Sequence, residues 1–139
     1  MNQTETPIQS TLVVEELRMR FLPARLGRHY LRGEGMFFDW ARRLSPDYTG
    51  GHWLFFELSN GGFYVAPAAM QVPVTVSWHL NGYDGQMGVE AFGIVVTLFA
   101  LSHMIELFSD NGHLIDAYHA LRDFAASHPE MSAIFRAID

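Results

Sequence analysis

Seven histidines are the residues of this chain best suited to bind a metal ion, but their spacing does not form a metal site. Zinc takes three or four protein ligands, and the sequence has neither an HExxH motif nor two histidines four residues apart. His113 and His119 are six residues apart, whereas His103 and Glu106 could touch on a helix but offer only two ligands. The sequence therefore predicts no bound metal.

Glu57 is the carboxylate that most suggests a functional role. It shares one face of an expected strand with Trp53 and Phe55, and the opposite face is apolar as well. A strand covered on both faces would remove this carboxylate from water, a state often found at functional sites. The alternative, which we favour, is a structural partner such as an arginine of the first long helix.

Motifs for nucleophilic catalysis and for phosphate binding are absent from the sequence. There is no cysteine and no G-x-S-x-G elbow, and Gly33-Glu34-Gly35 lacks the third glycine of a dinucleotide-binding loop. The glycine pairs at 50–51 and 61–62 do not precede a helix, so we interpret them as turn residues. The residues thus give little support for an enzyme.

Charge is distributed unevenly along the chain. The formal net charge is -6, yet seven of the nine arginines lie between Arg18 and Arg43, where only Glu34 and Asp39 oppose them. That segment carries +5 and the remainder -11. The arginines form either a solvated helical face or a patch for phosphate or an acidic partner. A mimic of DNA is not favoured, because the 15 acidic residues are scattered rather than closely spaced.

The expected helices and strands, which would position the residues named above, form one domain of the α+β class over residues 12–139. A loosely ordered lead-in is expected at 1–11. We expect a short helix around 13–21 that Pro23 stops, and a longer one over 29–44 with an apolar stripe.

The middle of the chain predicts an antiparallel sheet of about four strands. Asn60-Gly61 between two aromatic segments is a strong hairpin signal. The expected strands are His52–Leu58, Phe63–Ala66, an alternating segment from Val74 to Leu80, and a short strand near Gln86–Val89.

The last third of the chain predicts helices packed with this sheet. The segment 90–108 is apolar almost all round, which is typical of a buried helix, and its uncharged part is too short to span a membrane. A second helix is expected over 113–127, and a last one with Pro129 at its first position.

Five stretches in a fixed order resemble the ArdB/KlcA antirestriction family along nearly the whole chain. They are RFLPARLGRHYLRGE (20–34), ARRLSPDYTGGHW (41–53), FELSNGGFY (56–64), GIVVTLFALS (93–102) and HPEMSAIFRAID (128–139). The resemblance implies an α+β fold, carriage on plasmids or other mobile elements, and relief of type I restriction in bacterial cells. It also implies no cofactor and no known catalysis. We expect a cytoplasmic location, which the absence of cysteine and of a signal-peptide pattern fits.

Two further expectations concern partners and residues. The partner would be the host type I restriction system, reached directly or through another host protein, with no small-molecule substrate and no membrane. Direct DNA binding through the Arg18–Arg43 segment is the competing hypothesis, and an undetected enzyme with Glu57 in its pocket is a third. The candidate functional surface comprises Arg42, Asp47, Tyr48, Glu57, Asn60 and Asp139.

Asp139 is included because it ends the expected last helix. Its side chain and the α-carboxylate would stand at the negative end of the helix dipole, which is unfavourable there. A frayed, solvated terminus would lessen that cost. Our hypothesis is that Asp139 meets an arginine, within this protein or on its target.

Overall fold

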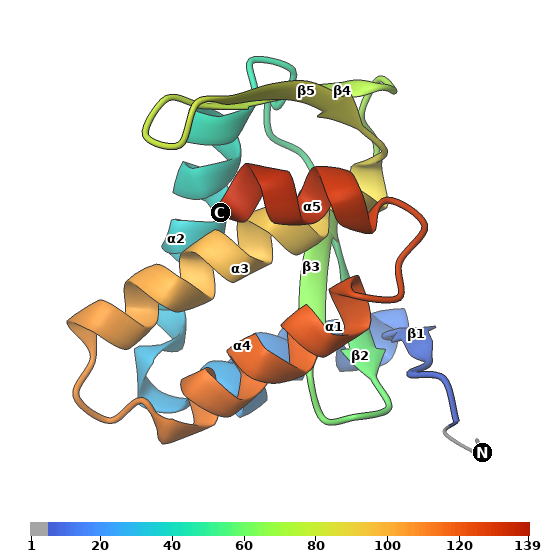
Figure 1. Ribbon diagram of the computed structural model, residues 1–139. Coiled ribbons are helices and arrows are strands. Elements are labelled where there is room, and N and C mark those ends of the chain that lie inside the picture. Colours follow the sequence, from blue (N-terminus) through green and yellow to red (C-terminus); the bar gives the residue numbers. More distant parts are fainter. Residues whose placement is uncertain (1–5) are drawn as a thin grey trace.

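The computed structural model describes residues 6–139, and its elements form the α+β fold expected from the sequence (Figure 1). The helices are α1 (Glu15–Leu26), the 3₁₀ turn η1 (Gly27–His29), α2 (Tyr30–Leu44), α3 (Val89–Leu107), α4 (Gly112–Ala125) and α5 (Met131–Ile138). The strands are β1 (Ser10–Leu12), β2 (Trp53–Leu58), β3 (Phe63–Pro67), β4 (Val74–Trp78) and β5 (Tyr83–Met87).

The strands belong to two sheets rather than to the single sheet that we expected. Strands β1, β2 and β3 form one antiparallel sheet in that order, and β4 pairs only with β5. The expectation fails between β3 and β4, where Pro67 ends one strand and Pro73 precedes the next. Proline has no N–H to donate to a ladder, so the chain leaves the first sheet here and continues to the hairpin at the top of Figure 1. The last expected strand is present but begins earlier, at Tyr83.

Helix α3 is the centre of the fold and packs against β3, α2, α4 and α5 (Figure 1). Phe92 and Val96 are fully buried and Phe99 is partly buried, which confirms the prediction of a buried helix. By length and composition alone this helix could cross a membrane, but 61% of its most apolar window is buried inside the protein. A helix that is apolar all round and buried in this way serves as a core helix.

The contact between α3 and β3 is unusually close. A Cβ at Gly93 would lie 2.5 Å from the Val65 carbonyl oxygen and would also collide with the Ala66 side chain. One turn later, the Thr97 hydroxyl accepts a hydrogen bond from the Val65 N–H at 3.1 Å and donates one to the Gly93 carbonyl at 2.8 Å. A helix thus covers the free edge of this sheet and satisfies a strand N–H that no other strand pairs.

Helix α1 runs through Pro23 instead of stopping before it, which corrects the prediction of a short helix around 13–21. Leu22 and Leu26, on either side of the proline in sequence, are both buried in the core. Their burial outweighs the one backbone hydrogen bond that proline cannot donate. The helix ends at Gly27, whose φ of 66° suits a residue without a side chain.

The two ends of the chain differ from expectation in small ways. The expected lead-in at 1–11 falls partly outside the described residues, and its last two residues, Ser10 and Thr11, lie in β1 and pair with β2. Helix α5 begins at Met131 rather than at Pro129. The residues before it form a turn that side chains hold to the start of α3, since His128 Nε2 forms a hydrogen bond with Glu90 Oε1 at 3.0 Å. The Glu130 carboxylate accepts a hydrogen bond from the Gly88 N–H at 3.0 Å, at the start of α3, where the helix dipole favours an acid.

Candidate functional site

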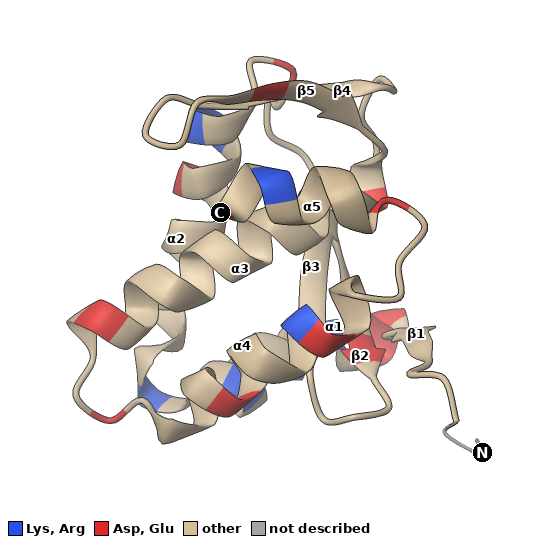
Figure 2. Ribbon diagram, in the orientation of Figure 1, with Lys and Arg blue, Asp and Glu red and all other residues tan. Residues whose placement is uncertain are grey.

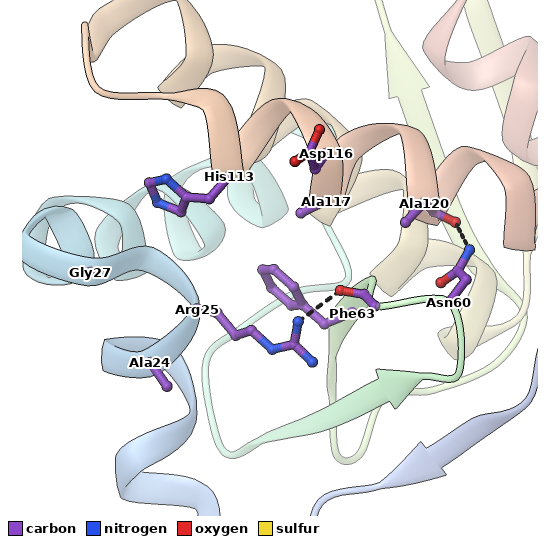
Figure 3. A pocket seen from close by; sticks show the side chains of 10 residues that line it. Ala24, Arg25, Gly27, Asn60, Phe63, His113, Asp116, Ala117 and Ala120 are labelled. Atoms are coloured by element: carbon purple, nitrogen blue, oxygen red, sulfur yellow. Dashed lines mark hydrogen bonds between the residues drawn. The ribbon is translucent and has the colours of Figure 1, made fainter.

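A polar groove of about 520 Å³ lies between the end of α1, the β2–β3 turn and the first half of α4 (Figure 3). We call it the polar groove. Small residues form much of its wall, and the polar side chains that line it are Arg25, Asn60, His113 and Asp116. It is the largest of the cavities described, so it is the default place to look for a functional site.

Arg25 lies at the floor of the polar groove and is held by the protein itself. Its Nη1 donates to the Gly61 carbonyl at 2.8 Å, and its Nη2 donates to Glu57 Oε2 at 3.0 Å. The guanidinium also lies over the rings of Phe21 and Phe63. These contacts satisfy the charge of Arg25 within the protein and hold the β2–β3 hairpin against α1.

Glu57 is therefore not the desolvated carboxylate of an enzyme pocket. Its side chain is 55% exposed, although Leu58, the next residue of β2, is buried. The structural partner that we favoured is present, but Arg25 belongs to α1 and not to the first long helix, α2. A carboxylate this exposed retains much of its hydration, and its ion pair contributes little to stability.

Asn60 forms the other link across the polar groove. Its Nδ2 donates to the Ala120 carbonyl in α4 at 2.8 Å, and its Oδ1 accepts from the Gly62 N–H at 3.1 Å. In Figure 3, dashed lines mark the bond from Asn60 to Ala120 and the bond from Arg25 to the Gly61 carbonyl. The hairpin turn is thereby tied to α1 on one side and to α4 on the other.

His113 and Asp116 remain as the polar groups in this groove that form no ion pair within residues 6–139. Both are exposed on α4 and neither adjoins a hydroxyl or thiol nucleophile in the groove lining. General acid–base catalysis needs a group within hydrogen-bonding reach of a reacting atom and tuned to the working pH. An exposed pair on one helix turn supplies neither a nucleophile nor an enclosed site.

Three other candidate residues lie in the last turn of α2 and in the loop after it, where they form structural contacts. Asp47 accepts a hydrogen bond from the Thr75 N–H at 2.7 Å and so joins this loop to β4. The buried Tyr48 hydroxyl accepts one from Trp53 Nε1 at 3.0 Å. Arg42 is exposed, pairs with Asp39 at 3.3 Å and lies over the Tyr48 ring.

Asp139 lies at a third place and meets an arginine within the protein, as one form of our hypothesis required. Its Oδ1 is 3.7 Å from Arg122 Nη1 in α4. Arg122 also donates a hydrogen bond to the Tyr118 hydroxyl, and this bond, followed by the charge of Asp139, raises the pKa of the guanidinium above its ordinary value. The Asp139 side chain is 61% exposed, so it remains open to a further partner.

The six candidate residues thus occupy three separate places and do not form one site. Sequence reasoning singled out Glu57 and Asn60 but missed Arg25, His113 and Asp116, which complete the polar groove. The signal for Arg25 was available, since Arg18, Arg25 and the buried Leu22 recur with helical spacing, but Pro23 led us to end the helix too early.

Figure 2 shows acidic and basic residues interspersed along the visible helices. Within residues 6–139, no group of three or more histidine, aspartate or glutamate side chains could hold a metal ion.

Comparisons with known proteins identify relatives along the whole chain. The family model described as antirestriction protein matches residues 46–139. Two Escherichia coli proteins named antirestriction protein KlcA are each 44% identical, the first over 100% of both chains and the second over 99% of this chain and 97% of its own. The uncharacterized protein YfjX of Escherichia coli K12 is 38% identical over 99% of this chain and 92% of its own.

A solved structure is similar to this fold along the whole chain. It covers 100% of both chains with a TM-score of 0.86 and 44% sequence identity. The description of that structure reports that the KlcA and ArdB proteins show a novel fold. It also reports antirestriction activity against type I DNA restriction systems in vivo but not in vitro. Full-length similarity in sequence and in structure, together with the family match over residues 46–139, shows that this chain belongs to the antirestriction protein family.

Proposed function

We propose that this protein relieves type I restriction of incoming plasmid or phage DNA, as an inhibitor and not as an enzyme. The observation that carries the proposal is the 44% identity over the full length of a KlcA protein, supported by the structural match. The unit responsible is the single domain expected over residues 12–139, together with the strand residues that precede it. Its place of action is the bacterial cytoplasm, where restriction takes place.

The side chains of the polar groove support an inhibitor without catalytic activity. The contacts of Arg25 and Asn60 within the protein account for two of its four polar side chains. The other two, His113 and Asp116, are exposed to water. Protein contacts at the surface explain inhibition without requiring a reactive centre.

Binding to protein rather than to DNA is supported by the charge of the chain. The net charge is -6, and the arginines of α1 and α2 share these helices with four carboxylates, those of Glu15, Glu16, Glu34 and Asp39. DNA-binding proteins gain affinity by neutralising several phosphates at once, which needs a continuous basic surface. A mimic of DNA needs the opposite, a continuous acidic surface, and the interspersed charges do not support that either.

The route of inhibition in this proposal runs through another host component. The relatives are described as active in vivo but not in vitro. A protein that contacted the restriction enzyme directly would be expected to act on the purified enzyme as well. We therefore propose that this chain binds a further protein of the restricting cell.

The test is the plating of unmodified phage on a host with a type I restriction system, with and without this protein. We expect the plating efficiency to rise when the protein is present. A host without the restriction system provides the control and should show no change. Equal plating efficiencies on the restricting host, at confirmed expression, would contradict the proposal.

A further inference from the structure

A second groove, which we call the aromatic groove, lies between the first half of α1, α2 and the start of β2. Its volume is about 310 Å³, and it deepens into a smaller cavity of about 30 Å³. Phe38, Trp53 and Phe55 line both parts. Trp53 and Phe55 alternate along β2, so both point to the face of the sheet that α1 and α2 cover.

The rim of the aromatic groove carries an arginine and a glutamate that have no partners. Within residues 6–139, Arg18 and Glu34 form no ion pair, although both line the groove. The Nε atom of Arg18 is buried and has no hydrogen-bond acceptor. A buried donor without an acceptor is costly, and native structures rarely retain one without a reason.

Met19 stands beside Arg18 at the same rim and is 91% exposed. Methionine is flexible and polarizable, and exposed methionines are frequent on surfaces that accept apolar side chains of varied shape. The groove therefore joins an apolar floor to an adaptable wall, with one positive and one negative group on its rim.

From this geometry we infer that the aromatic groove binds a polypeptide segment that presents a large apolar side chain next to a carboxylate. The apolar side chain occupies the floor formed by Phe38, Trp53 and Phe55, where aromatic rings contribute more than their buried area alone. The carboxylate accepts hydrogen bonds from Arg18, and Glu34 accepts one from a main-chain N–H of the segment. The inference rests on the proposed function, since it names the kind of protein surface that this inhibitor recognises.

A polypeptide fits this groove better than a single-stranded nucleic acid does. Aromatic side chains and an arginine also stack on nucleic-acid bases. A nucleic acid carries a phosphate with every base, so one of them would lie near the Glu34 carboxylate and be repelled, whereas a peptide places its single carboxylate at Arg18 and a neutral main-chain N–H at Glu34.

The test is a titration of the purified protein with short peptides. Binding is monitored by NMR through the ¹H–¹⁵N signal of the Trp53 indole. Three capped tetrapeptides serve as ligands: Gly-Phe-Asp-Gly, the amide form Gly-Phe-Asn-Gly, and Gly-Ala-Asp-Gly. We expect the first to shift the signal at millimolar concentration and the other two to bind about tenfold more weakly, because one loses the charge-assisted hydrogen bond and the other the apolar contact. This comparison uses the natural protein, so it does not depend on how a variant folds.

Two variants locate the binding on the protein. Arg18→Met should weaken binding of Gly-Phe-Asp-Gly about tenfold and leave the amide peptide unaffected. Arg20→Met is the matched control, since Arg20 is exposed on the same helix and does not line the groove, and it should bind as the natural protein does.

Equal affinity for the acid and amide peptides, no shift with any peptide, or an equal shift with oligothymidylate would each overturn the inference. Because the titration uses only this protein and peptides, its outcome is independent of phage plating. The proposed function can therefore fail while the groove binds, and the groove can fail while the function holds.

Discussion

Arg18 and Arg25 lie seven residues apart on α1, along the same face of the three-stranded sheet, yet their surroundings are opposite in kind. Arg25 donates to Glu57 and to the Gly61 carbonyl and closes the polar groove from below. Arg18 has a buried Nε with no acceptor and opens onto the aromatic groove. The difference shows that the polar groove is mainly a structural junction, whereas the aromatic groove retains an N–H of Arg18 that no group within residues 6–139 accepts.

Both grooves depend on β3, which contributes Phe63 to the polar groove and Val65 to the small cavity below the aromatic groove. The position of β3 is in turn fixed by α3. Substitutions in the contact between α3 and β3 should therefore affect both grooves together, and substitutions of single arginines should separate them.

Gly93→Ala should have the largest effect. The added methyl group would meet the Val65 carbonyl and the Ala66 side chain, and neither the backbone nor a side chain this short can move aside. We expect a loss of about 3 kcal/mol in the free energy of unfolding, measured by urea denaturation. Gly35→Ala on α2 is the control, because a Cβ there meets nothing within 4 Å. Unchanged stability of Gly93→Ala would mean that α3 and β3 are farther apart than described.

Thr97→Val should have the next largest effect. Valine matches threonine in shape but cannot accept the hydrogen bond from the Val65 N–H, which would then be buried without a partner. We expect a loss of about 2 kcal/mol, together with fast hydrogen exchange of the Val65 amide. If that amide stays protected in the variant, another group satisfies it and our description of the β3 edge is wrong.

Arg25→Met should have a moderate effect on stability, and Arg18→Met almost none. The first removes two hydrogen bonds at a side chain that is 24% exposed, for a loss of about 1 kcal/mol. The second removes a buried N–H that has no acceptor, so we expect no loss and at most a small gain in the free energy of unfolding. Equal losses in the two variants, compared by urea denaturation, would remove the distinction between the grooves.

The sequence predicted what depends on local pattern. The hairpin around Asn60 and Gly61, the alternation in β4 and the buried α3 all follow from periodicity and turn chemistry. It did not predict what depends on tertiary packing. The extension of α1 through Pro23 rests on the burial of Leu22 and Leu26, and that extension is what brings Arg18 and Arg25 onto one face.

The candidate residues show the same limit. Glu57 meets an arginine as we expected, but its exposure could not be deduced, because the aromatic residues on both faces of the strand pattern predicted a carboxylate shielded from water. Asp47 and Tyr48 make contacts to β4 and to Trp53 that no spacing in the sequence indicates.

Deletion of Asp139 should have a small effect on stability and a larger one on function. Its ion pair with Arg122 is long and exposed, so we expect the free energy of unfolding to change by less than about 0.5 kcal/mol. If the carboxylate also meets a partner, phage protection should fall markedly in the truncated protein. Asp139→Asn distinguishes the side-chain charge from the chain length. Full protection by the truncated protein would show that Asp139 has no role beyond its contact with Arg122.

The most direct test of the account is the plating efficiency of unmodified phage on a type I restricting host that expresses the natural protein, Arg18→Met or Arg20→Met at equal levels of folded protein. The account predicts that the natural protein and Arg20→Met raise the plating efficiency equally, and that Arg18→Met lowers it toward the value without the protein. Protection by Arg18→Met as complete as that by the natural protein would contradict the claim that this inhibitor acts through the aromatic groove.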